Sequence, residues 1–119
     1  MTRNIDMAIE AREYYKTYAI DGNVTVNTGT ARFYAYDDAT LVITKAYVGT
    51  APVGSSINIT VNKNGSSAET LSIADGATSA SSTPDVAVSQ GDYITVDITQ
   101  IGSSTAGADL RINLIFRKT

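Results

Sequence analysis

The chain has 119 residues, of which 43% are hydrophobic and 18% charged, and this size and composition indicate one globular domain with a single core. Its formal net charge of −3, with nine scattered Lys and Arg residues, argues against nucleic-acid binding, which needs clustered positive charge. The absence of His and Cys excludes the usual nucleophile–base pairs, thiolate zinc sites and disulfides.

The first twenty residues differ in composition from the rest of the chain. They carry Asp6, Glu10 and Glu13 without a continuous apolar run, so we expect no secretion signal, and no later segment has the length of a membrane span. We therefore expect a protein made in the cytoplasm that has no membrane partner. Residues at spacings of three, four and three fall on one helical face: Ala8, Ala11, Tyr15 and Tyr18. This spacing favours a short helix over Ile5 to Lys16, and an extended arm is the alternative because tyrosines also suit strands. We expect residues 1–20 to form this arm or short helix beside a domain of residues 21–119.

Short segments rich in β-branched and aromatic residues, separated by turn residues, follow along the domain. Strands are predicted at residues 24–26, 31–36, 40–48, 56–62, 69–73, 86–88, 94–99 and 110–117. Asn64-Gly65 supplies the positive φ angles of a tight hairpin between the fourth and fifth of these. Residues 75–83 are mostly Gly, Ala, Ser and Thr without periodicity, which predicts an exposed loop.

The last two strands alternate apolar and polar residues, with Ile115 as the one exception. We expect them to form a hairpin that buries one face. The inward residues are predicted to be Ile94, Val96, Ile98, Leu110, Ile112, Leu114 and Phe116, and on earlier strands Ile57, Ile59, Val61, Leu71 and Ile73. A half-buried antiparallel sheet needs a second layer to cover its apolar face. The predicted fold class is therefore all-β: an antiparallel β-sandwich, jelly-roll-like, of about eight short strands.

No catalytic constellation is visible in the sequence, so we expect that the chain is not an enzyme and that it uses no cofactor. The acidic residues of the predicted turns could supply oxygen ligands to calcium, and these are Asp37, Asp38, Asp75, Asp85 and Asp109. Their spacing matches no EF-hand loop, and turns stabilised by the Asp side chains are the favoured interpretation, so no metal is expected. The tyrosines of the first half of the chain favour packing or a protein partner over sugar binding, since no Trp accompanies them.

Several turns and strand edges together carry a family resemblance. They are residues 28–30 before an aromatic strand, the loop 49–56, the turn 62–65, a Ser/Thr-rich loop, and residues 91–92, 100–103 and 107–110. This pattern resembles a β-sandwich domain of tailed-bacteriophage virion proteins, of the head decoration or cement type or the fibre type.

The resemblance implies a structural virion protein at the capsid surface, made in the host cytoplasm. It would be a cement protein that binds the major capsid protein and bridges coat subunits as a homo-oligomer, with a trimer favoured over a dimer. The expected partner-binding residues are Ile5, Ile9, Tyr14, Tyr15, Tyr18, Tyr34 and Tyr36. The alternative is a tail or neck fibre component whose loops 75–83 and 103–107 face a host receptor. The short chain favours the cement protein.

Overall fold

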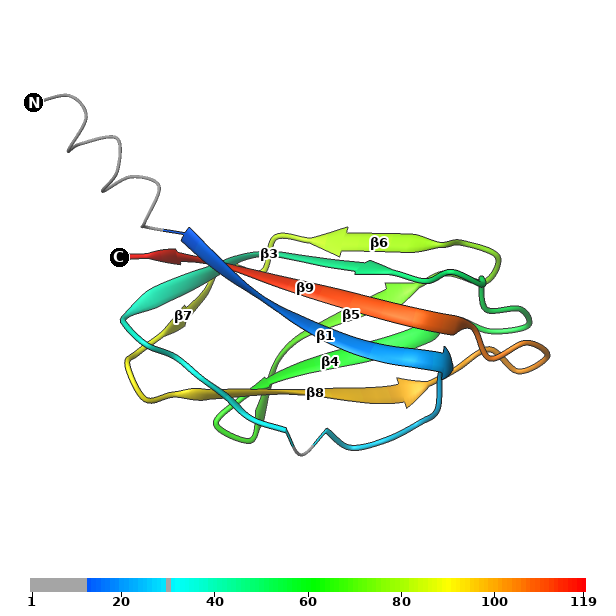
Figure 1. The fold of residues 1–119 in the computed structure, drawn as a ribbon, viewed down its shortest axis with the longest axis horizontal. Coiled ribbons are helices and arrows are strands. Elements are labelled where there is room, and N and C mark those ends of the chain that lie inside the picture. The colour runs from blue at the N-terminus through cyan, green and yellow to red at the C-terminus, as the bar shows by residue number, and fades with distance from the viewer. Residues whose placement is uncertain (1–12, 30) are drawn as a thin grey trace, which may run out of the picture.

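The computed structural model describes residues 13–29 and 31–119, and these residues form nine strands and no helix (Figure 1). The strands are β1 (Glu13–Asn23), β2 (Phe33–Tyr34), β3 (Ala39–Tyr47), β4 (Ile57–Lys63), β5 (Ser66–Ile73), β6 (Ser79–Ser82), β7 (Val86–Val88), β8 (Tyr93–Gln100) and β9 (Ala108–Lys118). The all-β prediction is confirmed.

The strands form two antiparallel sheets that pack face to face. In one sheet the order is β1-β9-β3-β6, with β7 beside the other half of β3; in the second it is β2-β8-β4-β5. Since β6 and β7 follow one another along the same edge of β3, the chain makes eight strand positions in two four-stranded sheets. This arrangement is that of a jelly roll, so the predicted sandwich of about eight strands is confirmed.

Alternation along the strands places apolar side chains between the two sheets. Every residue predicted to point inward is buried, and the largest fully buried side chains include Phe116, Leu41, Ile57 and Ile59. The central strands β9 and β3 contribute most to one wall of the core, and β4 and β8 contribute most to the other. The sequence pattern predicted this core because an extended chain alternates its side chains between two faces.

One of the two predicted hairpins is confirmed and the other is wrong. β4 and β5 form the tight hairpin, and its turn residues Asn64 and Gly65 have φ angles of 53° and 86°. By contrast, β8 pairs with β2 and β4, whereas β9 pairs with β1 and β3, so these two strands lie in opposite sheets. Alternation marks which side chains are buried but does not distinguish strands that pair within a sheet from strands that face each other across the core.

The predicted loop at residues 75–83 contains a strand. Ser79–Ser82 form β6 and pair with Thr44–Tyr47 of β3. Ser and Ala have low β-strand propensity. This edge strand is therefore stabilised by its backbone hydrogen bonds to β3 and by packing, not by the intrinsic preference of its residues. Only the turn that precedes it fits the expected loop.

The N-terminal segment also differs from the prediction. Residues 13–20, expected in the arm, belong to β1 and pair with β9 from Glu13 opposite Arg117 to Ile20 opposite Leu110. The predicted helix is therefore wrong from Glu13 to Lys16, because the amphipathic side chains of this segment gain a core-facing position in the sheet. The remainder of the predicted helix, with Ile5 and Ile9, lies outside the described residues.

Polar contacts join the strands on the side of the sandwich away from β1. The buried Thr44 hydroxyl on β3 donates a hydrogen bond to the Glu69 carboxylate on β5, and the Ser82 hydroxyl on β6 donates to the other Glu69 oxygen at 2.7 Å. Glu69 lies next to Val61 in the β4–β5 ladder, so its carboxylate points toward the interior. The two hydroxyls supply the hydrogen bonds that a carboxylate needs when it leaves bulk water.

The turn before β8 is fixed by a carboxylate. Asp92 accepts a hydrogen bond from the Ser89 backbone N–H at 2.8 Å and another from the Asn64 side-chain amide at 3.0 Å. The bond from Ser89, followed by that from Asn64, lowers the pKa of Asp92 below its ordinary value of 3.8. The charged carboxylate therefore ties the β4–β5 turn to the start of β8.

Candidate partner-binding surfaces

The structure does not gather the predicted tyrosines into one site. Along β1, Tyr14 and Tyr18 face the second sheet and are partly buried against the core, whereas Tyr15 lies on the outer face of the first sheet. Tyr34 and Tyr36 lie on and just after β2, in the second sheet. Neighbours in a strand point to opposite faces, so adjacent tyrosines cannot share one surface.

Tyr14 belongs to an aromatic cluster that closes the sandwich between β1 and β2. Its ring stacks on Phe116 with a centroid distance of 5.2 Å and an interplanar angle of 14°, and it lies 6.2 Å from the Phe33 ring. Burial, followed by the negative charge of Asp37, raises the pKa of Tyr14 above 10.0. Its hydroxyl is buried without a hydrogen-bond partner among the described residues. These contacts give Tyr14 a packing role.

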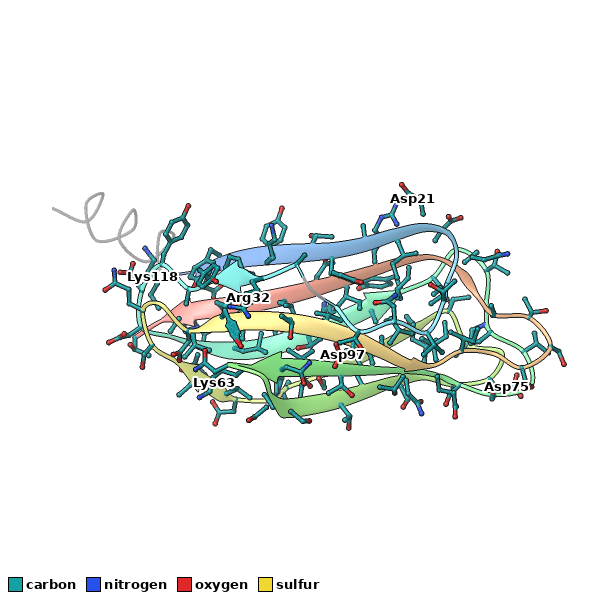
Figure 2. All side chains as sticks on the ribbon, turned by 90° about the horizontal axis from the view of Figure 1, so that it is seen from below. Asp21, Arg32, Lys63, Asp75, Asp97 and Lys118 are labelled. Carbon is teal, nitrogen blue, oxygen red and sulfur yellow. The ribbon has the colours of Figure 1, made fainter. Side chains whose placement is uncertain are left out.

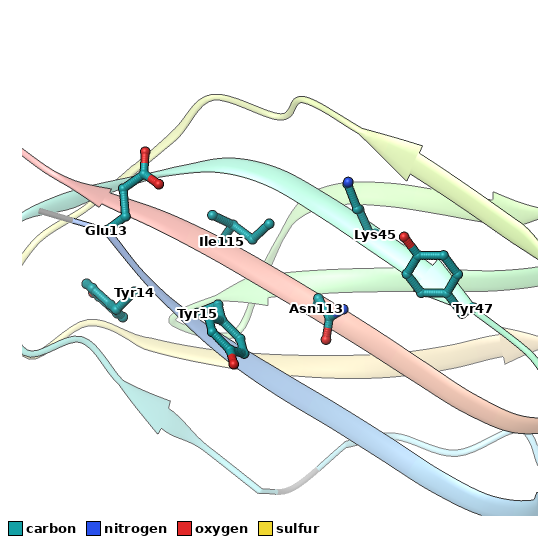
Figure 3. Close-up of a pocket in the computed structure, with 7 residues that line it drawn as sticks. All are labelled: Glu13, Tyr14, Tyr15, Lys45, Tyr47, Asn113 and Ile115. Atoms are coloured by element: carbon teal, nitrogen blue, oxygen red, sulfur yellow. The ribbon is translucent and has the colours of Figure 1, made fainter. Parts of the chain in front are cut away.

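A shallow hollow of about 500 Å³ opens on the outer face of the first sheet (Figure 3). Its lining comes from β1 (Glu13, Tyr14, Tyr15), β3 (Lys45, Tyr47) and β9 (Asn113, Ile115). The Tyr15 and Tyr47 side chains remain 71% and 43% exposed, and Figure 3 shows the Asn113 side chain between them. We call this site the sheet hollow.

The sheet hollow combines an apolar floor with polar groups at its rim. Glu13 is paired with Arg117 at 2.7 Å, and Asn113 accepts a hydrogen bond from Thr17 at 2.9 Å. Lys45 has no hydrogen bond or ion pair among residues 13–29 and 31–119. Exposed tyrosine rings are enriched in protein contact surfaces. Sequence reasoning missed Tyr47 and Ile115, although Ile115 was the apolar exception on the polar side of its strand.

A second exposed aromatic surface surrounds β2. Tyr34 and Tyr36 are 55% and 76% exposed, and the Tyr34 ring lies 5.9 Å from that of Tyr93. The Arg32 guanidinium stacks over the Tyr93 ring at 4.0 Å from its centroid and donates a hydrogen bond of 3.3 Å to the Tyr34 hydroxyl. Arg32 thus holds both rings in place. We call this group the β2 surface.

The acidic residues considered for calcium lie apart and support local structure. Asp37 pairs with Lys118 at 3.3 Å, and the carboxylate of Asp75 accepts a backbone N–H from Gly54 at 3.1 Å. Figure 2 shows Lys118 and Asp75 at opposite ends of the sandwich. Asp38 and Asp109 likewise accept the backbone N–H groups of Gln90 and Gly22, while Asp85 has a positive φ of 54°. Within the described parts of the chain, no three acidic side chains come together as metal ligands.

Among the residues described, no helix has the length and apolar character needed to cross a membrane.

No protein-family model and no curated protein matches the sequence. Solved structures do share the fold. A chain of the acidic stable capsid of Helicobacter pylori bacteriophage KHP30 superposes with a TM-score of 0.57 at 10% identity, over 88% of this chain and 86% of that one. The catalytic unit of a thermostable GH87 alpha-1,3-glucanase from Streptomyces thermodiastaticus gives a TM-score of 0.50 at 14% identity, over 91% of this chain. This chain spans only 26% of the glucanase unit. At such identities the likeness establishes the fold alone.

The glucanase corrects one prediction. The expectation that the chain is not an enzyme is contradicted, because domains of this fold also form part of glycoside hydrolases. The expectation relied on the absence of His and Cys, yet glycoside hydrolysis uses pairs of carboxylates and needs neither residue. Because the same fold occurs in a capsid protein and in a hydrolase, the fold by itself does not tell which of the two functions a chain has.

Proposed function

We propose that this protein is a structural component of a bacteriophage virion, and more specifically a decoration or cement protein that binds the major capsid protein at the capsid surface. The observation that carries the proposal is the match of the whole jelly roll to a phage capsid chain, which covers most of both chains. The glucanase match covers only 26% of that enzyme unit, whereas the capsid match covers 86% of the capsid chain.

Bridging two coat subunits requires two contact surfaces on one molecule. The sheet hollow and the β2 surface supply exposed aromatic rings in different sheets of the sandwich. Tyrosine contributes large contact area with little conformational freedom to lose, and it is enriched where proteins meet. Repetition of both contacts over many coat subunits would add avidity to modest single affinities.

Within the N-terminal segment, the proposed capsid contact is limited to residues 1–12. Removal of residues 1–20 would delete most of β1 and expose Phe116, so that truncation tests folding rather than attachment. Deletion of residues 1–12 leaves β1 and its pairing with β9 intact. We propose that Ile5 and Ile9, which belong to these twelve residues, contribute to capsid binding.

The test uses capsids assembled without this protein, incubated with purified full-length chain and then sedimented. Tyr15→Ser combined with Tyr47→Ser removes the rings of the sheet hollow, and Tyr34→Ser combined with Tyr36→Ser removes those of the β2 surface. Each pair should weaken capsid binding at least about tenfold, as expected when interface aromatics are lost. Val53→Ser is the matched control, because Val53 is also exposed but belongs to the loop between β3 and β4 and lines neither surface. Wild-type occupancy by both double variants would refute the proposal.

A fibre component with receptor-binding loops is the second candidate, and one observation favours it. The loops 50–55, 74–78 and 101–107 meet at one end of the sandwich, where Val53 pairs with Thr105 and the Gly76 N–H donates to the Pro52 carbonyl at 2.7 Å. Loops gathered on a rigid scaffold commonly form binding sites. If the fibre proposal is right, purified protein binds host cells and Val53→Ser weakens that binding, while empty capsids take up none.

A further inference from the structure

β1 presents a long strand edge with no partner among the described residues. Nine of its eleven residues pair with β9 on one side, and β1 is the last strand of its sheet. The strand opposite it, β2, has only two residues and covers little of its length. An edge of this kind exposes a row of backbone N–H and C=O groups that can pair with another strand.

The inward side chains of this edge are only partly covered. Tyr18 and Ile20 are packed against the core but stay half-buried, and Lys16 lies with its ammonium 5.8 Å from the centre of the Phe33 ring. A narrow groove of about 110 Å³ runs beside them, lined in part by Tyr18, Phe33 and Leu114. A strand added at this edge would therefore gain backbone hydrogen bonds and cover apolar surface at once.

We propose that the occupant is β1 of a second copy, paired antiparallel about a two-fold axis at Tyr18. A two-fold contact requires a strand that complements itself, and β1 does so in this register. Tyr18 then faces Tyr18, Thr17 faces Ala19 and Lys16 faces Ile20, so inward side chains meet inward side chains. The register uses the full length of the strand and brings no two like charges together.

Registers shifted toward the N-terminal end of β1 are less favourable because of charge, and an axis at Ala19 pairs only residues 15–23 of the strand. A two-fold axis at Lys16 places two ammonium groups opposite each other, and an axis at Thr17 places Glu13 near Asp21. Like charges directly opposite destabilise a strand pair. The inward Lys16 thus excludes a competing alignment. The proposed dimer joins the two first sheets into one, with both sheet hollows on the same outer face, and it differs from the trimer expected from the sequence.

The experiment measures the mass of the full-length chain by sedimentation equilibrium, using charge pairs placed on the outer side of β1. Thr17 and Ala19 are exposed, and among the described residues the one side-chain hydrogen bond lost is the exposed bond from Thr17 to Asn113, so each variant should keep a folded monomer with a urea midpoint close to that of wild type. In the proposed register, Thr17→Asp with Ala19→Asp puts two acidic pairs across the axis, and Thr17→Lys with Ala19→Lys puts two basic pairs there. Circular dichroism and urea unfolding verify that each variant is folded.

Wild type should be dimeric at about 100 μM, a concentration that detects even modest interfaces. The dimer dissociation constant of each like-charge variant should be at least about tenfold higher than that of wild type. An equimolar mixture of the acidic and basic variants should form the dimer again. A monomeric or trimeric wild type, like-charge variants that dimerise normally, or a mixture that stays monomeric would overturn the proposal. Because no capsid is present in this measurement, its outcome is independent of the capsid-binding test.

Discussion

Two substitutions at Tyr14 separate its ring from its hydroxyl. The ring contacts Phe116 and Phe33, and each aromatic pair contributes about 1 kcal/mol beyond simple burial. Burial of roughly half the side chain adds about 1 kcal/mol. Tyr14→Ala should therefore lower the free energy of unfolding by about 3 kcal/mol. Tyr14→Phe keeps the ring and removes a buried hydroxyl without a hydrogen-bond partner, so stability should stay equal or rise by up to about 1 kcal/mol.

Urea unfolding followed by far-ultraviolet circular dichroism at neutral pH measures both values. The pH dependence gives a second check on Tyr14. Because its pKa in the folded state is raised by burial, its contribution to stability is complete below pH 10.0, the ordinary pKa, and is lost as the pH rises toward the folded-state pKa. Tyr14→Phe should therefore lose less stability than wild type above pH 10.0. If Tyr14→Phe destabilised the protein as much as Tyr14→Ala, the assigned packing role would be wrong.

Three further predictions concern the polar contacts and one turn. The pKa of Asp92 is lowered in the folded state, so its contribution to folding stability is present above pH 3.8 and is lost as the pH falls through the lower folded-state pKa. Urea unfolding measured at several acidic pH values should therefore show a smaller loss of stability for Asp92→Asn than for wild type. Thr44→Val should lower the free energy of unfolding by about 1–3 kcal/mol, because it leaves the Glu69 carboxylate with one hydroxyl partner. Thr70→Val on the exposed face is the control and should change the free energy of unfolding by less than about 0.5 kcal/mol. Equal effects of the two substitutions would contradict the buried contact. Gly107→Ala should lower the free energy of unfolding by about 1–3 kcal/mol and the melting temperature by several degrees. The φ angle of Gly107 is +98°, and the new Cβ would lie 2.7 Å from the Ile57 Cδ1. An unchanged melting curve would contradict this prediction.

The sequence predicted the core better than the connections between strands. Strict alternation identified the buried residues of β4, β8 and β9, because burial on one face leaves a period of two in the chain. The pairing of β8 with β9 was wrong because the same alternation arises for strands that face each other across the core. β6 was missed because Ser79–Ser82 lack the branched and aromatic residues by which strands are recognised.

The candidate site was predicted only in part, for a related reason. Tyr15, Tyr34 and Tyr36 were predicted to bind a partner, and their side chains are exposed in the structure, but the segment around Tyr15 was expected outside the sandwich. Once residues 13–20 join the sheet, Tyr14 turns inward, and Tyr15 and Tyr47 of β3 both line the sheet hollow. These two residues lie far apart in the chain, so only the strand order places them on the same face.

The central proposal concerns where the protein is located in a virion. A cryo-electron microscopy reconstruction of purified virions, with this protein marked by a bound antibody fragment, tests it most directly. We expect density for the jelly roll on the capsid surface, repeated at equivalent positions between coat subunits and absent from particles that lack the protein. Label confined to the tail tip, or virions without the protein, would contradict the proposal.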